Sequence, residues 1–191
     1  MGKEKLYSFI VLVGPKHSGK SSVGRALAQL WGCDFIDLDE KITQRTGKTP
    51  RALYEEGREV FLEAEQQAVA ELVTQATSRP GPKPLIVAAG GGLIDNPGAL
   101  EVLKSRALLV SLEVDAATAW ERIRRNAQGS LSLPPFLRTE DPEKTHRLLH
   151  ERRTLGYKKV ANYTISTEHK SPTLIAEELD RVLSMIKHNF S

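Results

Sequence analysis

One stretch near the start of the chain, residues 6–25 (LYSFIVLVGPKHSGKSSVGR), constrains the fold more than any other. Residues 6–13 are a continuous apolar run of strand length, and residues 14–21 match the pattern G-x-x-x-x-G-K-[ST] at every fixed position. A buried strand that passes into a helix through such a loop directs its backbone N–H groups at a bound anion. The pattern therefore predicts a strand, a phosphate-binding loop and a helix, in a protein that binds a nucleoside triphosphate.

Each fixed position of this loop has a chemical reason. Gly14 and Gly19 let the phosphates approach the backbone closely, because a Cβ at either position would face them. Lys20 can reach the β- and γ-phosphates, and the Ser21 hydroxyl can ligate Mg²⁺. The residues predicted to bind the nucleotide here lie in the loop and the first helical turn: Gly14, Ser18, Gly19, Lys20, Ser21 and Ser22.

Length and composition narrow the class of protein. The 191 residues suffice for a single domain, 1–191, and 40% hydrophobic with 27% charged residues is ordinary for a soluble globular chain. The net charge is +3, and no basic stripe with interleaved aromatics indicates a nucleic-acid partner. The single cysteine, Cys33, excludes an internal disulfide and a cysteine-based zinc cluster.

The apolar runs also bear on location. None approaches the roughly 20 residues of a membrane span. The run at 6–13 ends in the phosphate-binding loop, where a secretory signal would have a small-residue cleavage site. We therefore expect a cytoplasmic enzyme that works as a monomer, without a membrane partner.

Apolar periodicity alternates between strand and helix along the rest of the chain. It predicts strands at 34–39, 85–89, 107–113 and 162–166, and helices at 58–77, 99–105, 115–126, 142–159 and 171–188, with short helical pieces at 43–57. This alternation predicts an α/β fold whose parallel sheet is covered on both faces. Segment 127–141 lacks periodicity, and a loop of this length in a phosphoryl-transfer enzyme is expected to be a lid.

Two groups of residues follow buried strands and so point to the ligand edge of the sheet. Asp37 and Asp39 lie two apart, and on an extended strand end they would face the same side, where Mg²⁺ is held. One carboxylate can serve the metal while the other meets an acceptor hydroxyl as base or orienting group. The triplet Gly90, Gly91 and Gly92 lets a ligand approach the backbone closely.

Arginines gather around segment 127–141. A lid that closes over phosphates needs cations, so one or two of them are expected to contact the nucleotide, although their spacing does not single out which. The group is Arg122, Arg124, Arg125, Arg138, Arg147, Arg152 and Arg153. The histidines show no metal-ligand spacing, and His17 is interpreted as a filler in the loop.

Together these motifs resemble the shikimate kinase family of small P-loop kinases over nearly the whole chain. The matching pieces are residues 14–25, FIDLDEKI at 35–42, RTGKTPRALYEEGREVFLEAE at 45–65, AAGGG at 88–92, PFL at 135–137 and RRTLGYKKVANYTI at 152–165. The resemblance implies a three-layer P-loop kinase fold with a five-stranded parallel sheet, as in nucleoside monophosphate kinases. It also implies ATP with Mg²⁺ as donor, a lid over the nucleotide at 127–141 and an acceptor-binding helical segment at 39–65.

The resemblance also implies residue roles. Lys20 would contact phosphates, Ser21 and Asp37 would handle Mg²⁺, and Asp39 would orient and activate the acceptor hydroxyl, which makes Lys20 and Asp39 the catalytic pair. Arg125 would lie against the adenine. The acceptor site would contain Asp39, Glu65, Gly90, Gly91, Gly92 and Arg153.

Two positions depart from the family pattern. Its helix motif G-x-x-x-F-R-x-x-E has Leu62 at the arginine position here, and its lid motif R-P-L-L has Pro134 there. Those two arginines, with the one that matches Arg153, normally grip the shikimate carboxylate. Their loss, at about 1.5–3 kcal/mol each, would weaken binding by a hundredfold or more.

A nearby arginine is expected to compensate. Arg58 lies one helical turn before Leu62 on a similar face and is the preferred substitute in the acceptor site, ahead of Arg138 and Arg152. If none compensates, the acceptor preference has changed. Glu65 would be free to meet a different polar group.

The sequence therefore predicts ATP-dependent phosphoryl transfer to a hydroxyl of a small polar metabolite, by default shikimate to shikimate 3-phosphate. A P-loop kinase for another hydroxylated acceptor, such as gluconate, stays open as an alternative. So does a non-catalytic nucleotide-binding regulator, although a pure binder has no need for Asp39. Few aromatics at 39–65 disfavour a nucleotide acceptor, and the absence of an N-K-x-D segment disfavours a GTPase.

Overall fold

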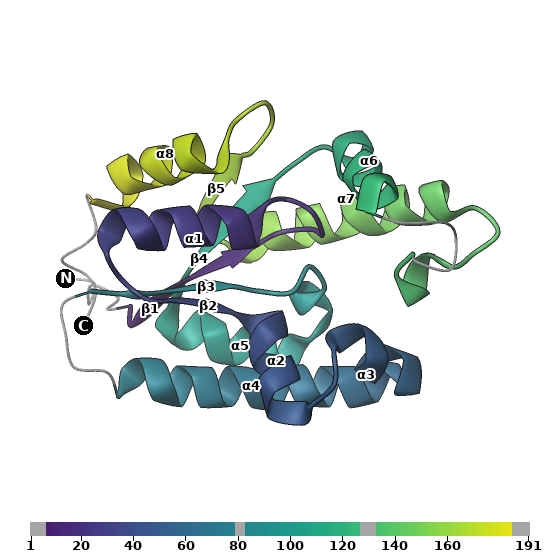
Figure 1. Cartoon of the computed structure of the whole chain (residues 1–191), viewed down its shortest axis with the longest axis horizontal. Coiled ribbons are helices and arrows are strands. Elements are labelled where there is room, and N and C mark those ends of the chain that lie inside the picture. The colour runs from purple at the N-terminus through teal and green to yellow at the C-terminus, as the bar shows by residue number, and fades with distance from the viewer. Residues whose placement is uncertain (1–6, 79–82, 127–132, 185–191) are drawn as a thin grey trace.

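Five parallel strands form the centre of the computed structural model, which describes residues 7–78, 83–126 and 133–184 (Figure 1). The sheet has the order β2-β3-β1-β4-β5. Its strands are β1 (Phe9–Val13), β2 (Phe35–Asp37), β3 (Leu85–Ala88), β4 (Ala107–Glu113) and β5 (Tyr163–Ser166). The predicted five-stranded parallel sheet is confirmed.

Helices cover both faces of this sheet, with α1 and α8 on one side and α4 and α5 on the other (Figure 1). No helix within the described ranges is long and apolar enough to cross a membrane. The α-helices are α1 (Lys20–Trp31), α2 (Leu38–Thr46), α3 (Pro50–Glu56), α4 (Arg58–Thr77), α5 (Pro97–Arg106), α6 (Ala116–Asn126), α7 (Pro142–Val160) and α8 (Pro172–Ser184). Two 3₁₀ turns, η1 (Leu93–Asp95) and η3 (Pro135–Leu137), complete the described elements.

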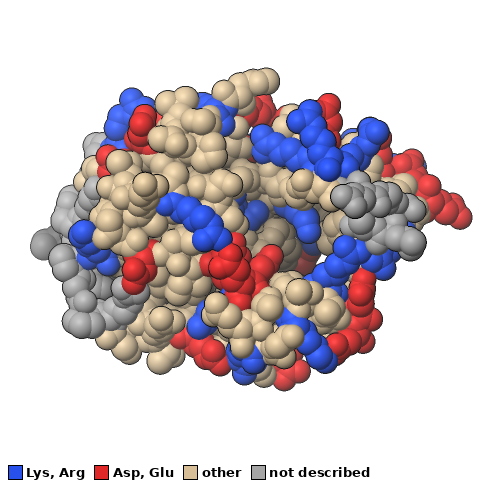
Figure 2. All heavy atoms as spheres, viewed as in Figure 1, with Lys and Arg blue, Asp and Glu red and all other residues tan. Residues whose placement is uncertain are grey.

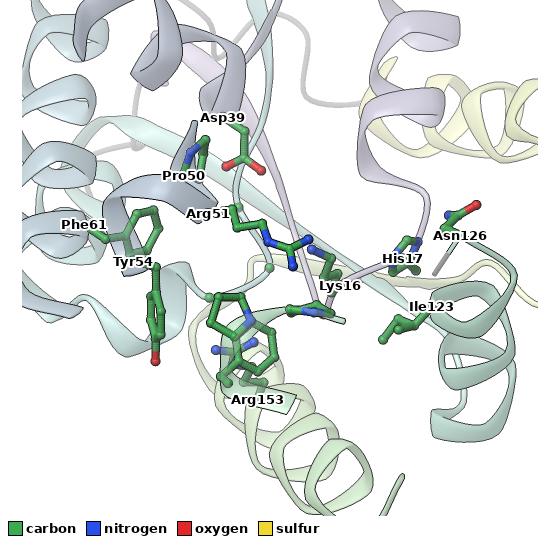
Figure 3. A pocket seen from close by; sticks show the side chains of 16 residues that line it. Lys16, His17, Asp39, Pro50, Arg51, Tyr54, Phe61, Ile123, Asn126 and Arg153 are labelled. Atoms are coloured by element: carbon green, nitrogen blue, oxygen red, sulfur yellow. The ribbon is translucent and has the colours of Figure 1, made fainter. Parts of the chain in front are cut away.

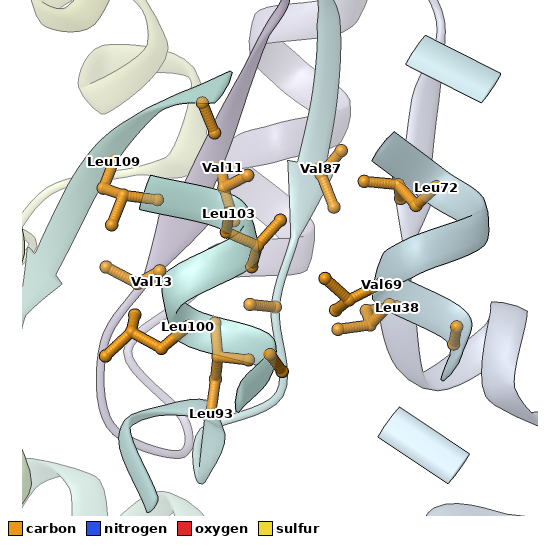
Figure 4. Packing of buried hydrophobic residues seen from close by; sticks show 14 of the residues in the cluster. Val11, Val13, Leu38, Val69, Leu72, Val87, Leu93, Leu100, Leu103 and Leu109 are labelled. Carbon is orange, nitrogen blue, oxygen red and sulfur yellow. The ribbon is translucent and has the colours of Figure 1, made fainter. Parts of the chain in front are cut away.

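The apolar run of β1 is continuous because both faces of the strand are buried. Phe9, Val11 and Val13 pack into the cluster that includes α4 and α5, part of which Figure 4 shows. Ile10 and Leu12 point the other way, into the cluster that includes α1 and α8. All five side chains are fully buried, which fixes β1 in the middle of the molecule.

The position of β1 determines where the ligand edge of the sheet lies. β1 pairs with β3 on one side and β4 on the other, and β3 pairs in turn with β2. The carboxyl ends of these parallel strands meet at one edge, where ligands bind in open α/β sheets. The phosphate-binding loop follows β1, the glycine triplet follows β3, and Asp37 is the last residue of β2, so all three converge there.

The predicted strand at 34–39 is wrong at its second half. β2 ends at Asp37, and Asp39 lies in the first turn of α2. The Asp37 side chain accepts a hydrogen bond of 3.0 Å from the Asp39 backbone N–H and so caps the helix. Aspartate is among the preferred N-cap residues, and that local hydrogen bond outweighs continuation of the short strand.

Some predicted boundaries lie outside the described residues. These are the part of the predicted lid at 127–132, the end of the last helix at 185–188 and residue 6 of the first strand. Within 133–141 the segment expected to be irregular contains η3.

Tyr157 links α7 to the glycine triplet and generates a stability prediction. Its side chain is fully buried, and its hydroxyl accepts from the Ile94 N–H at 3.1 Å and donates to the Gly91 carbonyl at 3.3 Å. Tyr157→Phe leaves both groups without this partner, so we expect a loss of about 1–3 kcal/mol in the free energy of unfolding, measured with denaturant.

Tyr163→Phe is the matched control, because the Tyr163 hydroxyl makes no hydrogen bond with the described residues. It should change the free energy of unfolding by less than about 0.5 kcal/mol. Equal effects of the two variants would contradict the role assigned to the Tyr157 hydroxyl.

Candidate active site

The Lys20 ammonium is held by the loop that precedes it. Its Nζ donates to the Gly14 carbonyl at 3.0 Å and the Pro15 carbonyl at 2.8 Å, and lies 3.4 Å from the Ser18 hydroxyl. Lys20 is buried, and burial lowers the pKa of its amine to about 8. The carbonyl dipoles offset only part of the cost of burying this positive charge. A bound anion would offset more of that cost, so the loop favours the binding of an anion.

The loop backbone requires glycine at two positions. A Cβ at Gly14 would lie 2.4 Å from the Leu112 carbonyl oxygen, and both Gly14 and Gly19 have positive φ angles, 138° and 92°. α2, α3, α5 and α7 each have an N-cap side chain that accepts from a backbone N–H, whereas α1, like α4, has a glycine as N-cap and no such side chain. The first N–H groups of α1 are therefore available to a phosphate.

Ser21 and Asp37, the two residues predicted to handle Mg²⁺, lie next to each other. The Ser21 hydroxyl donates to the second oxygen of Asp37 at 2.5 Å, while the first oxygen caps α2. Two oxygen donors at the N-terminus of α1 suit a hard cation such as Mg²⁺.

Two cavities meet at the edge of the sheet. The phosphate cavity, about 280 Å³, is lined by Lys20, Ser21, Ser22, Asp37 and neighbours. The acceptor cavity, about 330 Å³, lies on the side of α3 and α7. Five residues line both: Lys16, His17, Asp39, Gly90 and Gly91. Asp39 is therefore in contact with both spaces, as a group that acts on an acceptor hydroxyl must be, although it reaches them from a helical turn.

Each residue of the glycine triplet lines the acceptor cavity, and a side chain at any of them would meet a neighbour. A Cβ at Gly91 would lie 2.7 Å from the backbone nitrogen of Lys16, so the loop could not approach β3 as it does. A Cβ at Gly90 would lie 3.1 Å from Asp39 Oδ1 and 3.3 Å from Glu65 Oε1, and one at Gly92 would lie 3.2 Å from Arg153 Nη2. The triplet is thus the place where the two carboxylates and the arginine gather.

Side chains of both charges face the acceptor cavity in Figure 3: Asp39, Lys16, Arg51 and Arg153. Arg153 is mostly buried; it donates to Asp95 at 2.8 and 2.9 Å and lies over the Phe136 ring at 5.3 Å. Tyr54, Phe61 and Phe136 form an aromatic wall, with ring centroids 6.1 and 6.2 Å apart. Lys and Arg side chains also flank the hollow in the middle of the face in Figure 2.

The structure does not support Arg58 as the substitute for the missing arginine. Arg58 pairs with Glu59 at 2.9 Å, half of its side chain is exposed, and the described lining of the acceptor cavity does not include it. The reason is local, because the first turn of α4 directs Arg58 to the adjacent Glu59 and solvent. Arg152 pairs with Asp95 at 2.7 Å and Arg138 with Glu55 at 2.9 Å, and neither is among the described residues that line the cavity.

Comparison with known proteins identifies the family. The family model for shikimate kinase matches residues 16–185. The shikimate kinase of Acinetobacter baumannii (strain AYE) is 34% identical over 180 residues, which cover 94% of this chain and 92% of that protein. The chain belongs to the shikimate kinase family. It is accordingly an ATP-dependent kinase.

Solved structures agree with this assignment. Shikimate kinase from A. baumannii in complex with shikimate has a TM-score of 0.80 and 35% identity, and the match covers 95% of this chain and 96% of that one. A gluconokinase from Sinorhizobium meliloti has a TM-score of 0.63 at 17% identity, over 97% and 96% of the two chains, which shows the shared fold alone.

The family pattern missed two cations of the site, Lys16 and Arg51. Lys16 stands at a variable position of the phosphate-binding loop, and a second lysine in that loop was the available signal. Arg51 lies in the polar segment 43–57, where the sequence pattern did not single it out. His17, interpreted as a filler, has a positive φ of 62° and lines both cavities. Its carbonyl accepts from Arg122 at 2.8 Å, whereas Arg125 pairs with Glu121 at 3.4 Å and is mostly exposed, so its adenine contact stays a prediction.

Glu65, whose arginine neighbour in the family motif is replaced by Leu62 here, has Asn96 as its polar partner. Asn96 Nδ2 donates to Glu65 Oε2 at 3.0 Å, and the Glu65 side chain is fully buried. Burial, with Asp39 nearby, raises the pKa of the Glu65 carboxyl to about 7, against the opposing Asn96 hydrogen bond. A protonated Glu65 is therefore favoured in the folded protein at slightly acidic pH.

This raised pKa generates a pH prediction. Between its ordinary pKa of 4.5 and about 7, the unfolded chain releases the Glu65 proton first, so this group's contribution to stability is lost as pH rises through that window. Glu65→Gln keeps an acceptor for Asn96 and cannot ionise. We expect the free energy of unfolding of the variant, relative to the unaltered protein, to rise by about 3 kcal/mol from pH 4.5 to 8.

The variant and the unaltered protein contain the same other titrating groups. The effects of those groups on stability therefore cancel when the two free energies of unfolding are subtracted. His17, His146 and His150 have lowered pKa values because of burial, and they change stability in the opposite direction as pH rises. Glu63→Gln, the same substitution at an exposed position of α4, is the control for the change of side chain itself. A constant difference for Glu65→Gln would contradict the raised pKa.

Proposed function

We propose that this protein transfers the γ-phosphoryl group of ATP to the 3-hydroxyl of shikimate, with Mg²⁺ bound at Ser21 and Asp37. The observation that carries the proposal is Asp39, which lines both the phosphate and the acceptor cavity beside buried Lys20. A carboxylate at the junction of the two spaces can meet the acceptor hydroxyl and the transferring group together.

On the donor side, the chain supplies positioning and positive charge. The N–H groups at the start of α1 and the Lys20 ammonium would surround the phosphates, replacing the carbonyl contacts that Lys20 makes with Gly14 and Pro15. Because the Lys20 ammonium is buried, its charge would stabilise negative charge on the phosphoryl oxygens more strongly than a solvated lysine could. The arrangement of these donors before the nucleotide binds avoids reorganisation during the reaction.

The residues present fit Mg²⁺. Ser21 Oγ and Asp37 Oδ2, which share a hydrogen bond of 2.5 Å, would hold the ion once the serine proton turns away. When bound, Mg²⁺ neutralises charge on the phosphate oxygens. Asp37 also keeps its cap on α2, which holds Asp39 in place at the first turn of that helix.

On the acceptor side, Asp39 would orient the hydroxyl and receive its proton. Burial and the neighbouring Asp37 raise the pKa of the Asp39 carboxyl, and Lys20 and Lys16 oppose that shift. A raised pKa makes Asp39 a better proton acceptor than an aspartate with the ordinary value. Arg153 and the glycine triplet would contact the rest of the acceptor.

The alternatives have weaker support. A gluconate-like acceptor rests on fold similarity to the S. meliloti gluconokinase, and fold does not imply substrate. A non-catalytic regulator would not need a carboxylate at the junction of the cavities. A cytoplasmic location, a monomeric state and a nucleotide contact by Arg125 are further parts of this proposal.

Replacement of the two proposed catalytic residues tests the mechanism. Lys20→Ala and Asp39→Asn should each lower shikimate-dependent ADP release by at least about a thousandfold, the first by losing phosphate contacts and the second by losing the proton acceptor. Asp39→Asn should still bind ATP in calorimetry. Asp34→Asn, the same change on an exposed residue before β2, is the control.

Turnover of shikimate by Asp39→Asn at the rate of the control would remove the role of Asp39. ADP release by the unaltered protein with gluconate, and none with shikimate, would overturn the proposed acceptor.

Metal removal tests the donor site separately. Chelation with EDTA should abolish ADP release, and added Mg²⁺ should restore it. Ser21→Ala removes one oxygen donor, so the Mg²⁺ concentration for half-maximal rate should rise severalfold. An unchanged Mg²⁺ requirement in Ser21→Ala would place the ion elsewhere.

A further inference from the structure

The acceptor cavity has an excess of positive charge. Three cations line it, Lys16, Arg51 and Arg153, and Asp39 is the one carboxylate among the described lining residues, so the excess is two charges. Arg153 is already paired with Asp95. The remaining excess favours an acceptor that carries an anionic group.

Arg51 brings its charge to a particular place in this cavity. It stands on the first turn of α3, where Pro50 and the Thr49 cap begin the helix. Its Nη2 donates to the Leu133 carbonyl at 3.0 Å. Leu133 immediately precedes Pro134, one of the two positions where the family has a carboxylate-binding arginine. A guanidinium from α3 thus lies beside the position of the missing lid arginine.

The other arginines near this position are directed elsewhere. Arg138 also contacts the Leu133 carbonyl, at 3.3 Å, but it pairs with Glu55 and is not among the described lining residues. Arg51 faces the cavity between Asp39, Lys16 and Arg153 in Figure 3. Its ion pair with Glu55, at 3.4 Å between half-exposed side chains, is of the kind that contributes little and is readily exchanged.

We propose that Arg51 binds the carboxylate of the acceptor together with Arg153, and so takes over the role of the two arginines that the family has at positions 62 and 134. This inference rests on the proposed function. A guanidinium presents a planar fork that matches a carboxylate with two parallel hydrogen bonds. The apolar rings of Tyr54, Phe61 and Phe136 on one side of the cavity would lower the local dielectric around such a pair and so strengthen it.

The neighbouring lysine supports this assignment. Desolvation lowers the pKa of the Lys16 amine, Asp39 opposes this, and Arg51 and Arg153 lower it further. The three cations therefore repel one another across the cavity. An acceptor carboxylate between Arg51 and Arg153 relieves that repulsion, whereas an uncharged acceptor leaves it.

The test compares two acceptors, shikimate and its uncharged methyl ester, in ADP-release kinetics and calorimetry. Arg51→Gln should raise the KM and Kd for shikimate about ten- to hundredfold and change kcat little, because the groups at the transferring phosphoryl are intact. For the ester, Arg51→Gln and the unaltered protein should have nearly equal KM values. Arg51→Lys keeps the charge without the fork and should fall between.

Arg45→Gln is the matched control, because Arg45, in the last turn of α2, pairs with Glu71 of α4 and is not among the described residues that line the cavity. It should leave both KM values unchanged, and circular dichroism melts should show that all variants fold. An unchanged KM for shikimate in Arg51→Gln, or a rise produced by Arg58→Gln in its place, would overturn the inference and leave the proposed function standing. An unaltered protein that neither binds nor phosphorylates shikimate would overturn the proposed function and this inference with it.

Discussion

The buried ammonium of Lys20 is the interaction on which the site depends. It is taken out of water at the end of β1 and held by two loop carbonyls, so the loop must keep its shape to hold the charge. That shape requires Gly14, where a Cβ would collide with the Leu112 carbonyl of β4. The loop is therefore built into the sheet itself, because the neighbour that excludes a side chain at Gly14 is the next strand.

The sheet order brings the other parts of the site to this loop. β3 lies beside β1, and its glycine triplet touches the backbone of Lys16 more closely than any side chain would allow. Tyr157 of α7 and Glu65 of α4 lie against this triplet, and both side chains are fully buried. Residues distant in sequence thus depend on the same close approach between two neighbouring strands.

The fold could be predicted because its signals are local and redundant. A strand with both faces covered must be apolar throughout, as β1 is, and the motif after it has few other structural explanations. The error at Asp37 and Asp39 has a physical cause: the Asp37 side chain accepts from the Asp39 N–H and starts a helix after three residues of strand, and residue alternation does not reveal such a cap. Both carboxylates nevertheless line the phosphate cavity. The strand predicted at 38–39 and the helical turn found there both start from the carboxyl end of β2, so either one brings Asp39 to this edge of the sheet.

The long cationic side chains were the part of the site that could not be placed from the sequence. A family motif locates an arginine by its backbone position, but a guanidinium several bonds from its Cα can reach one place from different elements. Arg58 is the neighbour of Leu62 along the helix and yet pairs with Glu59, whereas Arg51, on another helix, reaches the carbonyl next to Pro134. An acceptor site can therefore keep its positive charge while the positions that supply it change. The affinity for a carboxylate acceptor depends on the net charge of the cavity and not on the match at single motif positions.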